Sequence, residues 1–174
     1  MMGIKKCIQM ESENVMSADN QQERLNAFWI VGFVDGEGCF HVGINKMPKM
    51  TCGFQVLPEF RVVQHKRDIE VLKRIRNVLN VGVVRRNHGD RFELRVRGKQ
   101  DLNKIISFFD EFPLQTKKQK DFLLFKKIIL LMKQQKHLNH KGIREIALIS
   151  SKMNRKIRPK YLESSETTRQ TLGD

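Results

Sequence analysis

The chain has 174 residues, which is enough for one domain with a substantial hydrophobic core. Its 33 Lys and Arg outnumber its 19 Asp and Glu, and the resulting formal net charge of +14 favours a polyanionic partner, most often nucleic acid. Three cysteines without metal-binding spacing argue against a disulfide framework or a zinc site, and no apolar run reaches the ~20 residues of a membrane span, so no membrane partner is expected.

The two ends of the chain differ in composition from its middle. Residues 1–19 are polar and aperiodic, which is typical of a flexible N-terminal extension, and residues 159–174 form a polar C-terminal tail. Residues 20–158 contain the periodic apolar patterns and are expected to form a single domain. The N-terminal segment has the features of neither a signal peptide nor an Arg-rich transit peptide, so we expect the protein to act in the compartment where it is made.

The first helix is expected to begin at Asn20, because Asn20 and Glu23 have the spacing of a capping box. Residues 25–34 are apolar nearly all round, so this helix must be covered on more than one side. Gly32 and Gly36 are four residues apart and share one face, where another backbone can approach closely. The sequence therefore predicts that this helix packs against a second helix.

Two acids, Asp35 and Glu37, stand at the end of this apolar helix, and glycines flank Glu37. The helix macrodipole disfavours a carboxylate at this end, and a cation held by Glu37 would offset that cost. Carboxylate oxygens with few other protein ligands suit Mg²⁺, whose remaining ligands are usually water and phosphate. On spacing alone, a turn that merely precedes the next strand explains the two acids equally well. Asp35 is expected to point elsewhere and to have a structural role.

The remaining residues predict two strands, a helix, two more strands and three helices. The expected elements are a strand from residue 38, a strand over 53–64, a helix capped by Asp68, strands over 81–86 and 91–97 around a turn at 87–90, and helices from Asp101, over 116–133 and over 141–154. Pro58 suggests a bulge or a strand edge. This order predicts an α+β fold, αββαββα, with a four-stranded antiparallel sheet that has helices on one face and polar side chains on the other.

Positive charge is concentrated on the sheet arginines and on the C-terminal helices. Residues 114–160 hold 14 Lys and Arg against only Asp121 and Glu145. A sheet face that carries Arg and Gln can enter a major groove and contact base edges, whereas lysine-rich helices suit phosphates. For any single lysine, a solvated helix face is the simpler explanation. The interpretation therefore depends on the total positive charge of this region and not on any one residue.

The segment IVGFVDGEG, residues 30–38, resembles the LAGLIDADG signature of the homing endonucleases. Gly32, Asp35, Glu37 and Gly38 fall where the signature places them, with Glu37 in place of the more common aspartate. The segments LPEFRVVQ (57–64) and LQTKKQKDF (114–122) also resemble segments of that family. The resemblance extends from about residue 24 to residue 157 and implies the same αββαββα fold, with the sheet as the DNA-binding face.

Several residue roles follow from this resemblance alone. Glu37 would bind the catalytic divalent metal ion with the Gly36 carbonyl as a further ligand, Gln64 would position water, and Lys118 would assist near the scissile phosphate, with Lys117 as the alternative. The ion would be Mg²⁺ or Mn²⁺, with Ca²⁺ binding without supporting cleavage. The residues expected to contact DNA are His41, Asn45, Gln55, Arg61, Arg85, Asn87, Arg91, Glu93, Arg95, Lys117, Lys120, Asn154, Arg155 and Lys156.

One motif supplies one active site, whereas cutting both strands of a duplex needs two. The resemblance is to the single-motif members, which pair as homodimers, and the expected interface comprises Trp29, Gly32, Phe33 and Gly36. The implied function is Mg²⁺-dependent double-strand cleavage of DNA at a long pseudo-palindromic site. The alternatives are an intron maturase, with RNA as partner, and a DNA-binding protein that does not cleave. A gene within a chloroplast or mitochondrial genome fits the lack of a transit peptide, with a bacterial cytoplasm as the alternative.

Overall fold

The computed structural model describes residues 25–154, so the predictions for residues 1–19 and 159–174 and the capping box at Asn20 and Glu23 lie outside the described residues. The elements are α1 (Ala27–Glu37), β1 (Gly38–Lys46), β2 (Phe54–His65), η2 (Lys66–Asp68), α2 (Ile69–Leu79), β3 (Val83–Arg86), β4 (Arg91–Val96), α3 (Lys99–Glu111), α4 (Lys118–Lys133), η3 (Lys136–Leu138) and α5 (His140–Ser150). No helix within 25–154 combines the length and apolar content that a membrane crossing requires.

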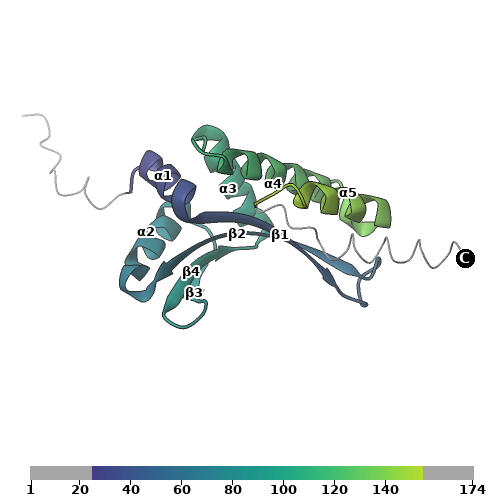
Figure 1. Cartoon of the computed structure of the whole chain (residues 1–174), viewed down its shortest axis with the longest axis horizontal. Coiled ribbons are helices and arrows are strands. Elements are labelled where there is room, and N and C mark those ends of the chain that lie inside the picture. Colours follow the sequence, from purple (N-terminus) through teal and green to yellow (C-terminus); the bar gives the residue numbers. More distant parts are fainter. Residues whose placement is uncertain (1–24, 155–174) are drawn as a thin grey trace, which may run out of the picture.

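The four strands form one antiparallel sheet in the order β1-β2-β4-β3. The helices α3, α4 and α5 lie on one side of this curved sheet, as Figure 1 shows. This arrangement confirms the predicted α+β fold and its αββαββ order, followed by helices. The strand pairing also confirms the hairpin predicted around residues 87–90, in which the Arg91 N–H donates to the His88 carbonyl at 2.9 Å.

The core lies between the sheet and its helical layer. Five phenylalanines are completely buried there, with neighbouring ring centroids 5.2–6.0 Å apart: Phe40, Phe60, Phe109, Phe122 and Phe125. Burial of one such side chain stabilises the fold by roughly 1.5–3 kcal/mol. Because side chains alternate along a strand, the neighbours of the buried strand residues point to the opposite face of the sheet. The core therefore determines which strand residues remain on the helix-free face.

Several predicted element boundaries were wrong. Helix α1 begins at Ala27 rather than near residue 20, and Asn26 is its N-cap, with a side chain that accepts from the Phe28 N–H at 2.8 Å. Helix α3 begins at Lys99, and Asp101 lies within its first turn, where its carboxylate accepts from the Gly82 N–H at 2.9 Å. Helix α5 ends at Ser150, four residues earlier than expected.

The proline in β2 makes no bulge. The β1–β2 register is continuous, with Pro58 opposite Val42. On its other side β2 pairs with β4 only from Phe60 onward, because β4 ends at Val96. Pro58 therefore lies where β2 has a free edge, the position at which a residue without an N–H costs no ladder hydrogen bond.

Candidate active site and nucleic-acid interface

The carboxylate of Glu37 lies at the joint between α1 and β1. Glu37 is the last residue of the helix and is exposed, and within residues 25–154 it makes no hydrogen bond or ion pair. The next residue, Gly38, begins β1 directly, and a Cβ there would lie 2.5 Å from Val34 Cγ1 and 2.8 Å from the Val34 carbonyl oxygen. Only glycine permits this abrupt change from helix to strand, so the joint fixes where the Glu37 carboxylate is presented.

Asp35 has the structural role that its offset from Glu37 predicted. Its carboxylate accepts from the Gln115 N–H at 2.7 Å, and from the N–H of Thr116 at 3.3 Å and the hydroxyl of Thr116 at 2.7 Å. The Thr116 hydroxyl oxygen in turn accepts from the Lys118 N–H at 3.2 Å. Asp35 therefore ties the start of α4 to the end of α1, although 80 residues separate them in sequence.

Lys118 lies at the motif because of this connection. Its Nζ donates to the carbonyl oxygens of Val34 at 2.9 Å and Gly36 at 3.3 Å. Burial lowers the pKa of Lys118, and nearby acidic groups, including Asp35 and Glu37, oppose that shift. Lys117, the alternative candidate, is exposed at the N-cap of α4. The geometry thus brings Lys118 to the carbonyls of the motif.

Gln64 lies at the same end of the sheet. Gly38, the residue after Glu37, pairs with Val62, and Gln64 follows two residues later on β2, opposite Phe92. It is half-buried and shares the helix-side face of β2 with Val62. Strand pairing therefore brings this polar side chain near the α1–β1 joint.

The residues at this joint suit a hard divalent ion that takes few ligands from one chain. The donors are the Glu37 carboxylate and the Gly36 carbonyl, both oxygen ligands, and the Gly36 carbonyl also accepts from Lys118 Nζ at 3.3 Å. Asp35 already accepts three hydrogen bonds from Gln115 and Thr116, and within 25–154 no cluster of three or more His, Cys, Asp and Glu residues could hold a metal ion. Mg²⁺ commonly keeps several waters and uses only one or two carboxylates. Among residues 25–154, one chain therefore supplies oxygen donors that fit only part of the coordination sphere of a hard divalent ion.

Replacing Asp35 with alanine is expected to loosen α4 from α1. The change removes three hydrogen bonds to a charged acceptor, so we expect the free energy of unfolding to fall by about 2 kcal/mol, measured by urea denaturation followed by circular dichroism. The matched control is Asp110→Ala, because the exposed Asp110–Lys126 pair should contribute less than about 1 kcal/mol. Equal losses in the two variants would contradict the role given to Asp35.

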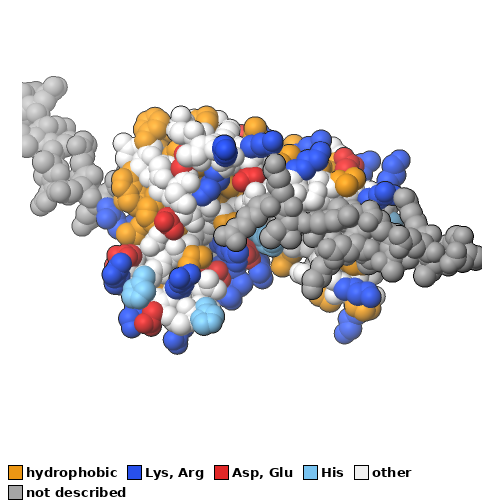
Figure 2. Space-filling view, in the orientation of Figure 1, with side chains coloured by type: hydrophobic (Ala, Val, Ile, Leu, Met, Phe, Trp, Pro, Cys, Tyr) orange, Lys and Arg blue, Asp and Glu red, His pale blue; other side chains and the backbone are white. Residues whose placement is uncertain are grey.

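The helix-free face of the sheet gathers the polar strand residues predicted to contact DNA. The strand register places on this one face the side chains of His41, Asn45, Gln55, Arg61, Arg85, Arg91, Glu93 and Arg95. Asn87 is exposed in the adjoining β3–β4 turn. Figure 2 shows Lys and Arg side chains around this turn and along the underside of the sheet. Such a curved basic face can follow the groove of a duplex.

Two acids on this face are buried, and their burial was not expected. Glu93 was predicted to contact DNA, but it is only 2% exposed, and Glu59, absent from the predicted site, is 4% exposed. Both are ion-paired with arginines. Strand alternation assigns Glu59 to this face, but no sequence signal indicated that arginines would cover it.

His41 lies on the same face, opposite Glu59. Its pKa is lowered, chiefly by burial and then by Arg61, while Glu59 acts in the opposite direction and Arg97 adds a smaller lowering. The lowered pKa favours the neutral form of the His41 ring. In that form the ring can both donate and accept a hydrogen bond.

The predicted phosphate contacts divide into three groups. Lys117 and Lys120 are exposed at the start of α4, as such a role requires. Asn154 is instead tied into the fold, because its side-chain amide donates to the Phe40 carbonyl at 2.9 Å and its N–H to Asp121 at 3.0 Å. Arg155 and Lys156 lie outside the described residues.

One face of α1 is apolar and uncovered. Phe28 is 71% exposed and Trp29 43% exposed, and Trp29 stacks on Phe33 with ring centroids 4.9 Å apart. A Cβ added at Gly32 or Gly36 would meet nothing within 4 Å. Hydrophobic side chains gather over α1 in Figure 2. The face predicted to pack against a second helix has no partner within residues 25–154.

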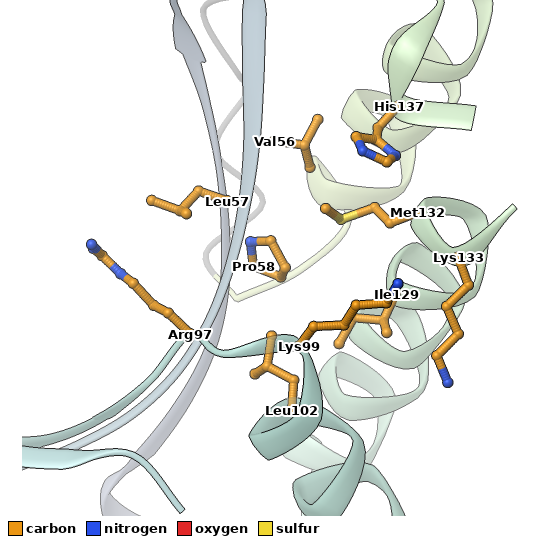
Figure 3. Close-up of a pocket in the computed structure, with 10 residues that line it drawn as sticks. All are labelled: Val56, Leu57, Pro58, Arg97, Lys99, Leu102, Ile129, Met132, Lys133 and His137. Atoms are coloured by element: carbon orange, nitrogen blue, oxygen red, sulfur yellow. The ribbon is translucent and has the colours of Figure 1, made fainter. Parts of the chain in front are cut away.

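A cleft of about 260 Å³ lies at the other end of β2 (Figure 3). Its lining is largely apolar and includes Val56, Pro58 and Met132, with Lys99 and Lys133 also present. No acid lines it. Val56 pairs with Ile44, six residues along β1 from Gly38, so this cleft lies about 20 Å from the α1–β1 joint. It is therefore separate from the candidate active site.

Comparison with known proteins identifies relatives of this chain. A family model described as LAGLIDADG endonuclease matches residues 30–129. Probable intron-encoded endonuclease 2 of Neurospora crassa is 36% identical over 125 residues, which cover 70% of this chain and 28% of that protein. The chain spans about a quarter of the length of the first curated relatives it matches, 26–28%.

Solved structures share the fold. The homing endonuclease I-TnaI superposes with a TM-score of 0.78 at 46% identity, covering 83% of this chain and 98% of that one. The I-SmaMI LAGLIDADG homing endonuclease bound to cleaved DNA has a TM-score of 0.78 at 30% identity, covering 83% of this chain and 49% of that one.

Proposed function

Because this chain belongs to the LAGLIDADG endonuclease family, we propose that it is a site-specific DNA endonuclease that cuts both strands of a duplex as a homodimer. The observation that carries the proposal is the α1–β1 joint, where the free carboxylate of Glu37 lies beside a lysine that Asp35 and Thr116 hold at the motif carbonyls. The relative I-SmaMI was solved on cleaved DNA, which supports duplex DNA as the substrate.

The dimer would form through α1. Gly32 and Gly36 leave an open strip between exposed aromatic side chains, and a second copy of the helix would cover Trp29 and Phe33. Two-fold pairing along this strip would bring the two Glu37 carboxylates together at the helix ends. Two symmetric subunits are suited to a long pseudo-palindromic site, with half-sites of roughly one helical turn, ~10 base pairs.

The chemistry would be divalent-metal-dependent hydrolysis of a phosphodiester. Glu37 and the Gly36 carbonyl would hold Mg²⁺ or Mn²⁺, and a bound ion would supply an activated water and stabilise the leaving 3′-oxygen. Ca²⁺ is expected to bind without supporting cleavage. Two paired carboxylates repel one another, which makes the site selective for cations. Lys118 would place positive charge beside the scissile phosphate, and the Gln64 amide would orient a water by hydrogen bonding.

The helix-free sheet face would contact the bases. His41, Asn45, Gln55, Arg61, Arg85, Asn87, Arg91 and Arg95 supply donors and acceptors there. Lys117 and Lys120 would contact phosphates, a role that also stays predicted for Arg155 and Lys156. Asn154 is withdrawn from this set because its amide already binds the Phe40 carbonyl.

The relatives also indicate where such a gene would lie. Several are named as intron-encoded endonucleases. A gene within an organellar intron, mitochondrial or chloroplast, agrees with that relationship.

Incubation of the full chain with a randomised duplex library tests the function and finds the target together. Separate reactions would contain Mg²⁺, Ca²⁺ or a chelator. We expect one family of related sites to be cut with Mg²⁺ and to be retained uncut with Ca²⁺. Retention without cutting under every condition would identify a DNA-binding protein that does not cleave. Preference for structured RNA over any duplex would favour a maturase.

A further inference from the structure

Two acids lie buried on the otherwise basic sheet face. Glu59 on β2 and Glu93 on β4 are the only charged residues that the structure buries among those it describes, with 4% and 2% exposure. A carboxylate removed from water is costly unless cations and hydrogen bonds compensate it. Each of these two therefore depends on the side chains that surround it.

Glu59 is held between two arginines. Arg97, the residue after β4, donates from Nε to Glu59 Oε2, and Arg61 Nη1 lies 3.7 Å from Glu59 Oε1. Figure 3 shows Arg97 projecting to the side of β2 away from the Leu102 and Ile129 side chains of α3 and α4. The pairing therefore lies on the proposed DNA-binding face.

Glu93 repeats the arrangement on the same face of the sheet, between β3 and β4. Arg85, its cross-strand neighbour on β3, donates from Nε to Glu93 Oε1 at 2.9 Å. Arg95 Nε lies 3.9 Å from the same oxygen. The two clusters meet in the middle, because Arg61 and Arg95 are directly opposite in the β2–β4 ladder. Like charges in that position repel, and each has an acid two residues before it on its own strand.

The four arginines are ion-paired but remain partly exposed to solvent. Their side chains remain 20–46% exposed, although the acids beneath them are buried. A guanidinium has five N–H donors, and its carboxylate partner here uses only part of them. The remaining donors can still reach a base edge, where arginine commonly binds guanine through two hydrogen bonds.

We propose that Glu59 and Glu93 are specificity-determining positioning residues, which present four arginines to DNA as two held groups rather than as four independent side chains. This role rests on the DNA-cleaving function proposed above and replaces direct base contact by Glu93. Held arginines lose less conformational freedom on binding. DNA whose base edges match the positions of these arginines is therefore favoured over DNA whose base edges are displaced from them. The acids also repel phosphates, which weakens sequence-independent binding to the backbone.

Glu59→Gln and Glu93→Gln in the full chain test this role. Binding to the selected site and to an unrelated duplex is measured across a salt series in Ca²⁺. For each variant we expect tighter binding to the unrelated duplex, a steeper salt dependence, and a loss of about tenfold in discrimination. A loss of fold integrity alone would weaken binding to both duplexes to the same extent. Equal weakening of binding to the two duplexes would therefore overturn the proposal. Relaxed preference at a single base pair for Glu93→Gln would instead show direct contact.

The matched control is Asp110→Asn on α3. It removes one exposed negative charge from a helix, through the same carboxylate-to-amide change. We expect it to leave discrimination between the two duplexes unchanged. If Asp110→Asn lowers discrimination as much as the two glutamate variants do, the effect comes from net charge and the positioning role fails.

A measurement without DNA separates this proposal from the proposed function. In NMR spectra of the free protein, we expect the Arg97 and Arg85 Nε–H groups to be protected from exchange relative to exposed Arg144. Protection of Arg97 should be lost in Glu59→Gln, and that of Arg85 in Glu93→Gln. If both groups are as unprotected as Arg144 in the wild type, the arginines are not held. If they are protected but the protein binds no duplex, the endonuclease function fails instead.

Discussion

Glu37→Gln is expected to abolish DNA cleavage while leaving the protein folded and bound to its site. The change removes a charged metal ligand but keeps the size and an oxygen of the side chain. A metal ion typically contributes several kcal/mol of transition-state stabilisation, and a loss of ~4 kcal/mol corresponds to ~10³-fold in rate. Single-turnover cleavage of the selected duplex in Mg²⁺, followed on both strands, measures the effect.

Stability and binding supply the controls for this variant. Because Glu37 makes no hydrogen bond or ion pair within residues 25–154 and lies at a helix C-terminus, its neutralisation should leave the melting temperature unchanged or slightly raised. Site affinity in chelator should stay within a few-fold, since no proposed base contact is lost. A variant that cuts at the wild-type rate would show that residue 37 holds no catalytic ion.

The sequence predicted the fold and the α1–β1 joint because both depend on local patterns. Alternating apolar residues identified β1 and β4, and Glu37 was placed at the end of the apolar helix, directly before the strand that begins at residue 38. Asp35 was expected to have a structural role because it lies two residues before Glu37, on a different face. Its actual partners, Gln115 and Thr116, could not be read from that spacing, because they depend on how α4 returns to α1.

The features that could not be predicted from the sequence depend on the pairing of distant strands or on the local backbone conformation at one residue. Burial of Glu59 and Glu93 follows from a register that surrounds each with arginines from two strands. Lys117 and Lys118 are adjacent and chemically identical, and one helical step of about 100° decides which reaches the motif. Asn154 precedes two basic residues and so resembled a phosphate contact, but its positive φ of 50° turns it back onto β1.

Gly32→Trp is expected to convert the dimer into a folded monomer. In an isolated subunit a Cβ at this position meets nothing within 4 Å, and replacing a helical glycine favours the helix by up to about 1 kcal/mol. In the proposed dimer the indole would occupy the space of the second helix. We expect sedimentation to give a dimer for the wild type and a monomer for the variant. The melting temperature should rise with protein concentration only in the wild type.

Loss of dimerisation should also weaken DNA binding, because a monomer can engage only one half-site. Losing the linked second contact typically costs 10²- to 10⁴-fold in affinity, so we expect weaker binding of that order and no double-strand cleavage by Gly32→Trp. Gly36→Leu should behave alike, since its position is equally open. Ser107→Leu, which adds an exposed apolar side chain to α3, should leave dimerisation and cleavage intact. If Gly32→Trp still sediments as a dimer and cuts both strands, the subunits meet through another surface, and the two Glu37 carboxylates are not paired at the ends of α1.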